Sequence, residues 1–339
     1  PDMICSAYNS KGSPEFFIGF PNQHSLYHVR YMFKNLHGVR LGFSSGTSCE
    51  LKNLNAEVIQ GGLLEKGLDF RYTIYEGPHT LTAEQFTDAI KFTIESFRTP
   101  PEAPARWHHA DLYPDFDIWG YQVRSNLKTR GFIDLKGVTR GGLSIGTRAW
   151  EPDGIPVPGV QIQVKTPPIY KPNTSYTLLN YTQAADSKTI SAVRSDASGR
   201  ITLASGAGNQ QFGIFLKNDP AEITLANYRV NGKSLFLDHM KECRLSLELL
   251  NRGGKAAKNI TVTLSSATPG VTIANPTLTV SKMESGELAW LPVDFLVTAA
   301  NKPTVDGSPF KVRFNLTISD DQNHSWEDEF DAAAYYEVP

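Results

Sequence analysis

Residues 68–97 read LDFRYTIYEGPHTLTAEQFTDAIKFTIESF, and this stretch decides the fold that we predict for the N-terminal part of the chain. Its first eight residues alternate apolar and polar side chains, which is the pattern of a β-strand. Thr82 is suited to cap a helix, and Gln85 stands three residues later, as a capping box requires. An apolar stripe at helical spacing follows, formed by Phe86, Ile90, Ile94 and Phe97. The stretch predicts a strand, a loop around His79 and an amphipathic helix.

Strand-like and helix-like segments also alternate before this stretch. Residues 39–43 read as a strand, and residues 54–66 read as a helix that Gly67 closes in the C-cap position. Such alternation is typical of a parallel α/β sheet. A histidine in the loop after a parallel strand lies at the carboxyl edge of the sheet, where open α/β folds place their sites. His79 is therefore a candidate general base, which would take a proton from a hydroxyl nucleophile and return it to the leaving group.

Residues 1–98 resemble the last third of an α/β-hydrolase of the esterase D-like kind, which includes feruloyl and acetyl esterases. The resemblance is carried by a series of segments: MICSA (3–7), GTSCE (46–50), LNAEVIQGGLLEKG (54–67), LDFRYTIY (68–75) and then His79. It implies a partial α/β-hydrolase lobe, with a parallel sheet and helices, and a serine–histidine–acid triad. In that triad His79 would be the general base. Glu50 would be the acid, because Cys49 occupies the family's acid position.

The serine of such a triad is not supplied by these residues. GFSSG (42–46) has the Gly-x-Ser-x-Gly pattern after a predicted strand, but the short separation from His79 leaves no room for an acid-bearing strand. GLSIG (142–146) lies inside a predicted strand with no helix behind it. Three strands alone would leave a normally buried parallel sheet uncovered. We therefore expect an upstream segment or a second chain to complete the hydrolase fold and supply the serine.

The sequence changes in character after the predicted lobe. Residues 99–110 read as a proline-rich linker, and short strands separated by polar turns follow in 111–219 and 220–339. Strands that recur every ~8–12 residues are typical of β-sandwiches. RLSLELLNRGG (244–254), followed by AKNITVTL (257–264), resembles the immunoglobulin-like, CARDB-type modules appended to bacterial secreted hydrolases. The predicted fold class is a multidomain chain, with a partial α/β-hydrolase lobe followed by two all-β immunoglobulin-like sandwiches.

Residues with metal-ligand side chains gather in WHHAD (107–111), followed by Asp115 and Asp117. Adjacent histidines on an extended chain point to opposite sides, so this stretch fits a polar linker better than a metal site. Asp196 and Asp306 stand in predicted turns, where aspartate binds backbone groups, and calcium is the lesser alternative there. We predict no metal and no cofactor.

Composition excludes several classes of protein. The 339 residues include 33 Lys and Arg and 35 Asp and Glu, a net charge of -2, which argues against a nucleic-acid partner. No run of ~18 apolar residues predicts a membrane span. The N-terminal residues lack the basic and apolar regions of a signal peptide. Cys5, Cys49 and Cys243 are too few for a disulfide scaffold, although Cys5 and Cys49 would be able to pair.

Two functions follow as expectations. The first is a carboxylic-ester hydrolase, secreted, periplasmic or at the cell surface, whose substrate is an ester or an acylated glycan. Whether the chain is an enzyme stays open, because Cys49 replaces the triad acid. The alternative is a non-catalytic scaffold or a glycan- or cell-surface-binding protein with a degenerate hydrolase fold. Trp290 and Trp326 would then stack on sugars, or else occupy positions in the core and at the edges of the sandwiches. A prolyl-oligopeptidase-type peptidase fits less well, since its propeller precedes the catalytic domain.

Overall fold

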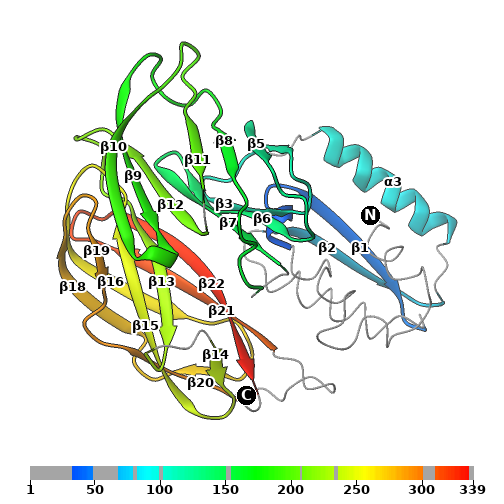
Figure 1. Ribbon diagram of the computed structural model, residues 1–339. Helices are drawn as coiled ribbons and strands as arrows, with labels where there is room; N and C mark the ends of the chain where they lie inside the picture. Colours follow the sequence, from blue (N-terminus) through cyan, green and yellow to red (C-terminus); the bar gives the residue numbers. More distant parts are fainter. Residues whose placement is uncertain are drawn as a thin grey trace. The chain divides into compact units, whose positions relative to one another are not determined.

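The computed structural model describes residues 33–48, 68–78, 82–98, 102–149, 154–206, 208–232, 236–300 and 310–335. These residues form twenty-two strands, one α-helix and two short 3-10 helices (Figure 1). The chain divides into two compact units, Pro1–His109 and Ala110–Pro339. Within the described ranges, neither the α-helix nor the 3-10 helices have the length and apolar character needed to cross a membrane.

The described part of the first unit contains a pair of parallel strands and one α-helix. The elements are η4 (Phe33–Leu36), β1 (Arg40–Gly46), β2 (Asp69–Tyr75) and α3 (Ala83–Arg98). The two strands and the helix were predicted and are confirmed. The capping box is present, because the Thr82 amide donates to Gln85 Oε1 at 2.7 Å and the Gln85 amide donates to Thr82 Oγ1 at 3.3 Å.

The helix packs on the strand pair through an aromatic ring rather than through its predicted apolar stripe. A Cβ at Gly42 would lie 2.9 Å from the Phe92 ring, so the absence of a side chain there lets the ring approach the strand. The guanidinium carbons of Arg40 and Arg71 lie 5.3 and 5.5 Å from the centre of the same ring. The stripe is exposed at all four positions, Phe86, Ile90, Ile94 and Phe97.

The predicted α/β-hydrolase lobe is wrong, and the resemblance to esterase D-like hydrolases is not supported. A hydrolase sheet needs several parallel strands with helices on both faces. Among the described residues of this unit there is one two-stranded parallel pair and one α-helix, while the rest of the described chain is nearly all β. The alternation of segments along the sequence predicted the two strands and the α-helix that the structure describes. It did not determine how many strands assemble into the sheet. The predicted strand at 3–7 and helix at 54–66 lie outside the described residues.

Two sheets form a first β-sandwich, which confirms the prediction of a β-sandwich after the linker. The six-stranded sheet has the order β10-β9-β12-β7-β6-β3, with β3 Trp107–Asp111, β6 Phe132–Thr139, β7 Gly142–Arg148, β9 Ser175–Thr182, β10 Ser187–Arg194 and β12 Gln210–Phe215. The four-stranded sheet has the order β11-β8-β5-β4, with β4 Phe116–Ile118, β5 Tyr121–Ser125, β8 Ile162–Lys165 and β11 Thr202–Ser205. The 3-10 helix η5 (Gln183–Ala185) connects β9 to β10.

The inner strands of the six-stranded sheet are covered on both faces, whereas the four-stranded sheet is covered on one. Consecutive strand residues point to opposite faces. In β6 the first four residues, Phe132 to Leu135, are all buried. In β8 the buried residues Ile162 and Val164 alternate with the exposed Gln163. The two faces of the six-stranded sheet therefore both meet other parts of the protein.

Two further sheets form a second β-sandwich. One has the order β13-β15-β20-β17 with β19 added to β15, namely β13 Ile223–Val230, β15 Glu242–Asn251, β17 Val271–Ile273, β19 Leu288–Trp290 and β20 Phe295–Ala299. The other has the order β14-β22-β21-β16-β18, namely β14 Phe236–Asp238, β16 Ala257–Ser265, β18 Thr277–Met283, β21 Phe310–Ser319 and β22 Ser325–Tyr335. The pairings are antiparallel except for β14 with β22.

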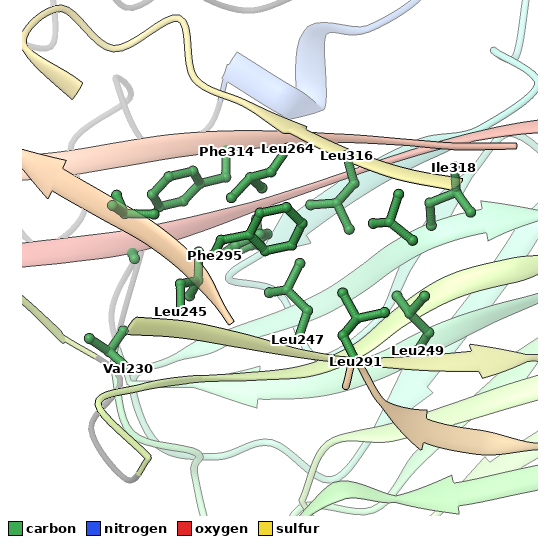
Figure 2. Packing of buried hydrophobic residues seen from close by; sticks show 14 of the residues in the cluster. Val230, Leu245, Leu247, Leu249, Leu264, Leu291, Phe295, Phe314, Leu316 and Ile318 are labelled. Atoms are coloured by element: carbon green, nitrogen blue, oxygen red, sulfur yellow. The ribbon is translucent and has the colours of Figure 1, made fainter. Parts of the chain in front are cut away.

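The core of the second sandwich lies between these two sheets. Figure 2 shows side chains of both sheets meeting there, with Leu245, Leu247 and Leu249 of β15 opposite Phe314, Leu316 and Ile318 of β21. Each of these residues is at most 1% exposed. The alternation of apolar residues in both strands is what places them on one face. The core therefore follows directly from the period-two pattern of the sequence.

Shortening a core leucine will destabilise the protein strongly. We expect Leu247→Ala to lower the free energy of unfolding by about 2–5 kcal/mol, because the fully buried side chain would leave a cavity. The measurement is urea unfolding of the full chain. Leu112→Ala is the matched control, since Leu112 is 45% exposed, and we expect it to cost less than about 1 kcal/mol. Equal losses for the two variants would contradict the placement of the core.

Candidate functional site

The predicted catalytic residues His79 and Glu50 lie outside the described residues, and so does Cys49. The strand ends that lead toward them are held together. The Thr47 amide donates to the carbonyl of Tyr75 at 2.9 Å, and the Ser48 amide donates to the carbonyl of Gly77 at 3.0 Å. The catalytic roles of His79 and Glu50 stay predictions.

The two Gly-x-Ser-x-Gly segments are ordinary strand sequence. Ser44 lies within β1 opposite Thr73, and Ser144 lies within β7 opposite Lys136. A nucleophile elbow instead needs a sharp turn from a strand into a helix. Neither serine has that geometry. This agrees with the expectation that neither segment supplies a nucleophile.

The residues considered for metal binding have other partners. Trp107–Asp111 forms strand β3. Asp117 pairs with Arg124 at 2.8 Å, and Asp115 accepts a hydrogen bond from the Ser125 amide at 3.2 Å. No cluster of three histidine, cysteine, aspartate or glutamate side chains that could hold a metal occurs among the residues the structure describes.

Asp196 and Cys243 have the structural roles expected of their types. Asp196 accepts hydrogen bonds from the Ser198 hydroxyl at 2.7 Å and from the Arg200 amide at 2.9 Å, and these bonds hold the pKa of its carboxyl well below the usual range. Cys243 is a buried free thiol, and burial raises its pKa. Asp306 and Cys5 lie outside the described residues.

A group of buried and half-buried polar side chains lies where the two sandwiches meet. We call this region the junction; it consists of Tyr181, Glu222, Glu248 and Arg252 together with an apolar cluster. Glu222 immediately precedes β13, and Arg252 immediately follows β15. Tyr181 belongs to β9 of the first sandwich, and Glu248 belongs to β15 of the second. The junction therefore joins residues that are far apart in the sequence.

Arg252 is the centre of the junction. Its side chain is completely buried, and its Nη2 atom donates to Glu222 Oε1 at 2.6 Å and to the Gly137 carbonyl at 2.7 Å. The Thr139 hydroxyl accepts from the same nitrogen at 3.1 Å and donates to Glu222 Oε1 at 2.7 Å. Gly137 and Thr139 belong to β6 of the first sandwich, whereas Arg252 and Glu222 flank strands of the second. One guanidinium thus connects the two sandwiches.

A glycine makes room for this arginine. A Cβ at Gly213 in β12 would lie 2.8 Å from Arg252 Cβ and 2.9 Å from its carbonyl oxygen. Cβ atoms essentially never approach another heavy atom this closely. One of the two neighbouring atoms is backbone, so it cannot easily move away. The close approach of β12 to the turn after β15 therefore requires glycine at this position.

An apolar cluster lies beside the ion pair. It combines Leu179, Tyr181 and Phe215 of the first sandwich with Ala226, Leu250 and Leu288 of the second. Leu179, Tyr181 and Phe215 point from β9 and β12 to the face of the six-stranded sheet that also carries Gly213. The second sandwich therefore covers this face, which explains why consecutive residues of the sheet are buried.

Tyr181 brings two carboxylates to one hydroxyl. Its oxygen lies 3.1 Å from Glu248 Oε2 and 3.2 Å from Asp186 Oδ1. A tyrosine hydroxyl has one proton, so it donates to only one of them at a time. Burial raises the pKa of Glu248; the hydrogen bond from Tyr181 opposes this rise and the nearby Asp186 adds to it. Burial, followed by the charge of Glu248, raises the pKa of Tyr181.

Three further side chains of the first sandwich donate hydrogen bonds to the second sandwich. Lys188 Nζ donates to the carbonyl of Gly286. Gln183 Nε2 donates to Asn227 Oδ1 at 2.8 Å. Gln211 Nε2 donates to the carbonyl of Leu225 at 2.8 Å, beside the point where the β13–β15 register shifts between Leu225 and Asn227. The open edge of β13 is therefore occupied by side chains of the first sandwich.

The aromatic residues considered for sugar stacking also have partners. The guanidinium carbon of Arg229 lies 4.3 Å from the centre of the Trp290 ring. Trp326 packs against the core of the second sandwich and lies 5.8 Å from the ring of His324. Trp290 is therefore covered on one face by a cation, and Trp326 is partly a core residue.

Sequence reasoning missed the junction. Arg252 and Asn251 were read as part of a turn between two strands, and Glu222 was not singled out. The available signal was the NRGG sequence after a long apolar strand, because an arginine there is either exposed or paired across an interface. Its partners Gly137 and Thr139 are more than a hundred residues away.

Comparison with known proteins identifies no family. No protein-family model matches the chain, and no curated protein matches it. The solved structures that the chain resembles weakly include the following three. Trypsin-activated alpha-2-macroglobulin from Escherichia coli has a TM-score of 0.23 and 12% identity, with 68% of this chain and 23% of that chain covered.

The other two structures are BcpA, the major pilin subunit of Bacillus cereus, and a tetra-tandem repeat in the extending region of a large adhesion protein. BcpA has a TM-score of 0.20 and 10% identity, with 47% of this chain and 64% of that chain covered. The adhesion repeat has a TM-score of 0.18 and 13% identity, with 68% and 71% covered. The chain thus spans under two thirds of the first two structures, and scores this low carry no argument about fold or function.

Removing the charge of Glu222 will destabilise the protein, because it leaves Arg252 buried without its counter-charge. We expect Glu222→Gln to lower the free energy of unfolding by about 3–5 kcal/mol. The measurement is calorimetric unfolding of the full chain. Asp117→Asn removes one partner of an exposed ion pair of similar length and should cost at most about 1 kcal/mol. Similar losses in both variants would contradict the central position of Arg252.

Neutralising Glu248 will have an effect that depends on pH. Because the folded-state pKa of Glu248 is raised, its contribution to stability is fully present below the unfolded value of 4.5 and is lost as the pH rises through the folded pKa. Glu248→Gln should therefore be more stable than the wild type at neutral pH, and the difference should shrink as the pH falls toward 4.5. Denaturant unfolding across this range tests it, with Glu242→Gln, an exposed position on the same strand, as the control. A difference that is independent of pH would contradict this account.

Proposed function

We propose that this protein is a non-catalytic scaffold in which the junction holds two β-sandwiches in one fixed orientation. The observation that carries the proposal is Arg252, which is completely buried and bonded to both sandwiches at once. A flexible pair of modules would expose this guanidinium to water on each motion. A buried charge instead requires that its partners stay in place.

The combination of apolar and polar contacts supports a rigid connection. Domains of one chain generally move relative to each other unless their interface is substantial and apolar. Here the apolar cluster of Leu179, Phe215 and Leu250 excludes water. Hydrogen bonds from Arg252 and Lys188 add directional restraints. A rotation that kept the apolar contact would still break these bonds.

The tyrosines in and near the junction are not suited to act as general bases. Burial raises the pKa of Tyr121 to about 12, and it also raises the pKa of Tyr170 and Tyr181. These hydroxyls stay protonated near neutral pH, so they do not serve as general bases. Arg252 and Glu222 are bonded to each other and to backbone or hydroxyl groups of the protein. The polar groups serve structure.

The proposal also places the protein outside the cytoplasm or at the cell surface, with a glycan or another surface component as its contact. This part continues the prediction from the sequence. Protease treatment of intact source cells, with a cytoplasmic protein as the control, tests the location. The ester hydrolase function stays an untested prediction that depends on His79 and Glu50, and the family resemblance that suggested it has been overturned.

Distance measurements between spin labels test the rigidity. We expect labels at Thr202→Cys in the first sandwich and Thr279→Cys in the second to give one narrow distance distribution, in a background with Cys5 and Cys49 replaced by serine. Labels at Thr272→Cys and Thr279→Cys, both in the second sandwich, give the width that a single rigid body produces. Glu222→Gln should broaden the first distribution and leave the second unchanged.

Two outcomes would contradict the proposed function. One is a broad or bimodal distribution between the sandwiches in the otherwise unaltered protein, since the modules would then move. The other is turnover of a p-nitrophenyl acyl ester that His79→Ala abolishes, since the chain would then carry a catalytic histidine. We expect the wild type and the His79→Ala variant to be equally inactive toward the p-nitrophenyl ester.

A further inference from the structure

Strand β10 (Ser187–Arg194) is an open edge of the six-stranded sheet. On one side it pairs with β9 through eight consecutive residue pairs, from Ser187 opposite Thr182 to Arg194 opposite Ser175, without a bulge. On the other side no strand of the described chain pairs with it. All of its residues except the half-buried Val193 are exposed. Figure 1 shows β10 at the end of the sheet, next to β9.

This edge lacks the features by which soluble proteins protect their edge strands. Such strands are usually interrupted by proline or a bulge, or they carry lysine side chains that repel another strand. β10 contains neither proline nor bulge, and its one lysine, Lys188, is bonded to the carbonyl of Gly286 in the second sandwich. The middle of the strand, residues 189–193 (TISAV), is uncharged, and Ile190 is 60% exposed.

We propose that β10 pairs in an antiparallel manner with β10 of a second copy of this chain, so that two six-stranded sheets join across a two-fold axis. Residues directly opposite each other in an antiparallel pair point to the same face of the sheet. The axis must therefore pass through one residue of the strand and its own copy. Three positions near the middle of the strand satisfy this condition: Thr189, Ile190 and Ser191.

Charge selects the register that is centred on Ile190. An axis at Ser191 places Lys188 opposite Arg194, and like charges directly opposite each other are destabilising. An axis at Thr189 places Arg194 opposite Ala184, so it gives the arginine no residue of opposite charge. An axis at Ile190 places Lys188 opposite Ala192 and keeps both cations away from each other.

The same register also brings opposite charges and apolar groups together. Ile190 then faces its own copy and covers the apolar surface that is exposed in the single chain. Arg194 then comes near the exposed Asp186 of the other copy, which immediately precedes the strand and whose carboxylate also accepts from the Tyr181 hydroxyl at 3.2 Å. The pair of Arg194 and Asp186 forms twice, once on each side of the axis. The occupant of the edge is therefore a second copy of this chain, and the inference does not depend on the proposed scaffold function.

The oligomeric state of the full chain tests the proposal. We expect sedimentation equilibrium to show a reversible dimer, which Ile190→Lys converts to a monomer by placing two like charges on the axis. Ile155→Lys is the matched control, because Ile155 is 66% exposed and lies outside β10, and this variant should stay dimeric. Circular dichroism establishes that both variants are folded.

Disulfide cross-linking tests the register independently. In a background with Cys5 and Cys49 replaced by serine, Ile190→Cys should form a disulfide-linked dimer under mild oxidation, since opposite Cβ atoms lie within reach of each other. Thr189→Cys, whose copy is two residues away in this register, should not. A charge exchange gives a further test. Arg194→Asp alone should weaken the dimer, and the double variant with Asp186→Arg should dimerise more strongly than Arg194→Asp alone.

Three results would overturn the inference. The first is a wild-type chain that stays monomeric at every concentration examined, which would leave the edge to a strand of another protein or to solvent. The second is a dimer that Ile190→Lys and Ile155→Lys affect equally. The third is cross-linking at residue 189 that is as efficient as at residue 190.

Discussion

The guanidinium of Arg252 is the constraint on which the arrangement of the two sandwiches depends. A buried cation is tolerated only when a counter-charge and hydrogen-bond acceptors surround it. Glu222 supplies the charge from the second sandwich, and the carbonyl of Gly137 supplies an acceptor from the first. The position of Arg252 in turn requires Gly213, because a side chain on β12 would collide with it. Arg252 thus requires a hydrogen-bond acceptor on β6 and a glycine on β12.

The junction explains why strands of the first sandwich contain runs of consecutive buried residues. A sandwich with one solvated face on each sheet alternates strictly between apolar and polar residues. The six-stranded sheet has a second covered face, so β12 ends in the run of buried residues Phe212 to Phe215. Tyr181 and Glu248 show the cost of that burial, since one hydroxyl proton serves two carboxylates. The interface is therefore stabilised by its apolar cluster and oriented by its polar groups.

Local structure was predictable from the sequence, and assembly was not. LDFRYTIY forms a strand, and Thr82 with Gln85 forms a capping box, because these features depend on neighbours within a few residues. The buried faces of β15 and β21 likewise follow from the local alternation of apolar residues. The predicted α/β-hydrolase fold was wrong because a strand, a loop and a capped helix occur in many folds, and their order does not determine the number of strands. The partners of Arg252 come from another sandwich, which no local pattern indicates.

The junction also influences a surface that is not part of it. Lys188 keeps its charge beside β10, but the direction of its side chain depends on its bonding partner. In the structure it bonds to Gly286, which fixes the second sandwich and leaves the uncharged middle of β10 without a nearby cation. One side chain of the edge strand β10 thus takes part in the contact between the two sandwiches. A change in the junction would alter the properties of this edge even if no residue exposed on its outer side were replaced.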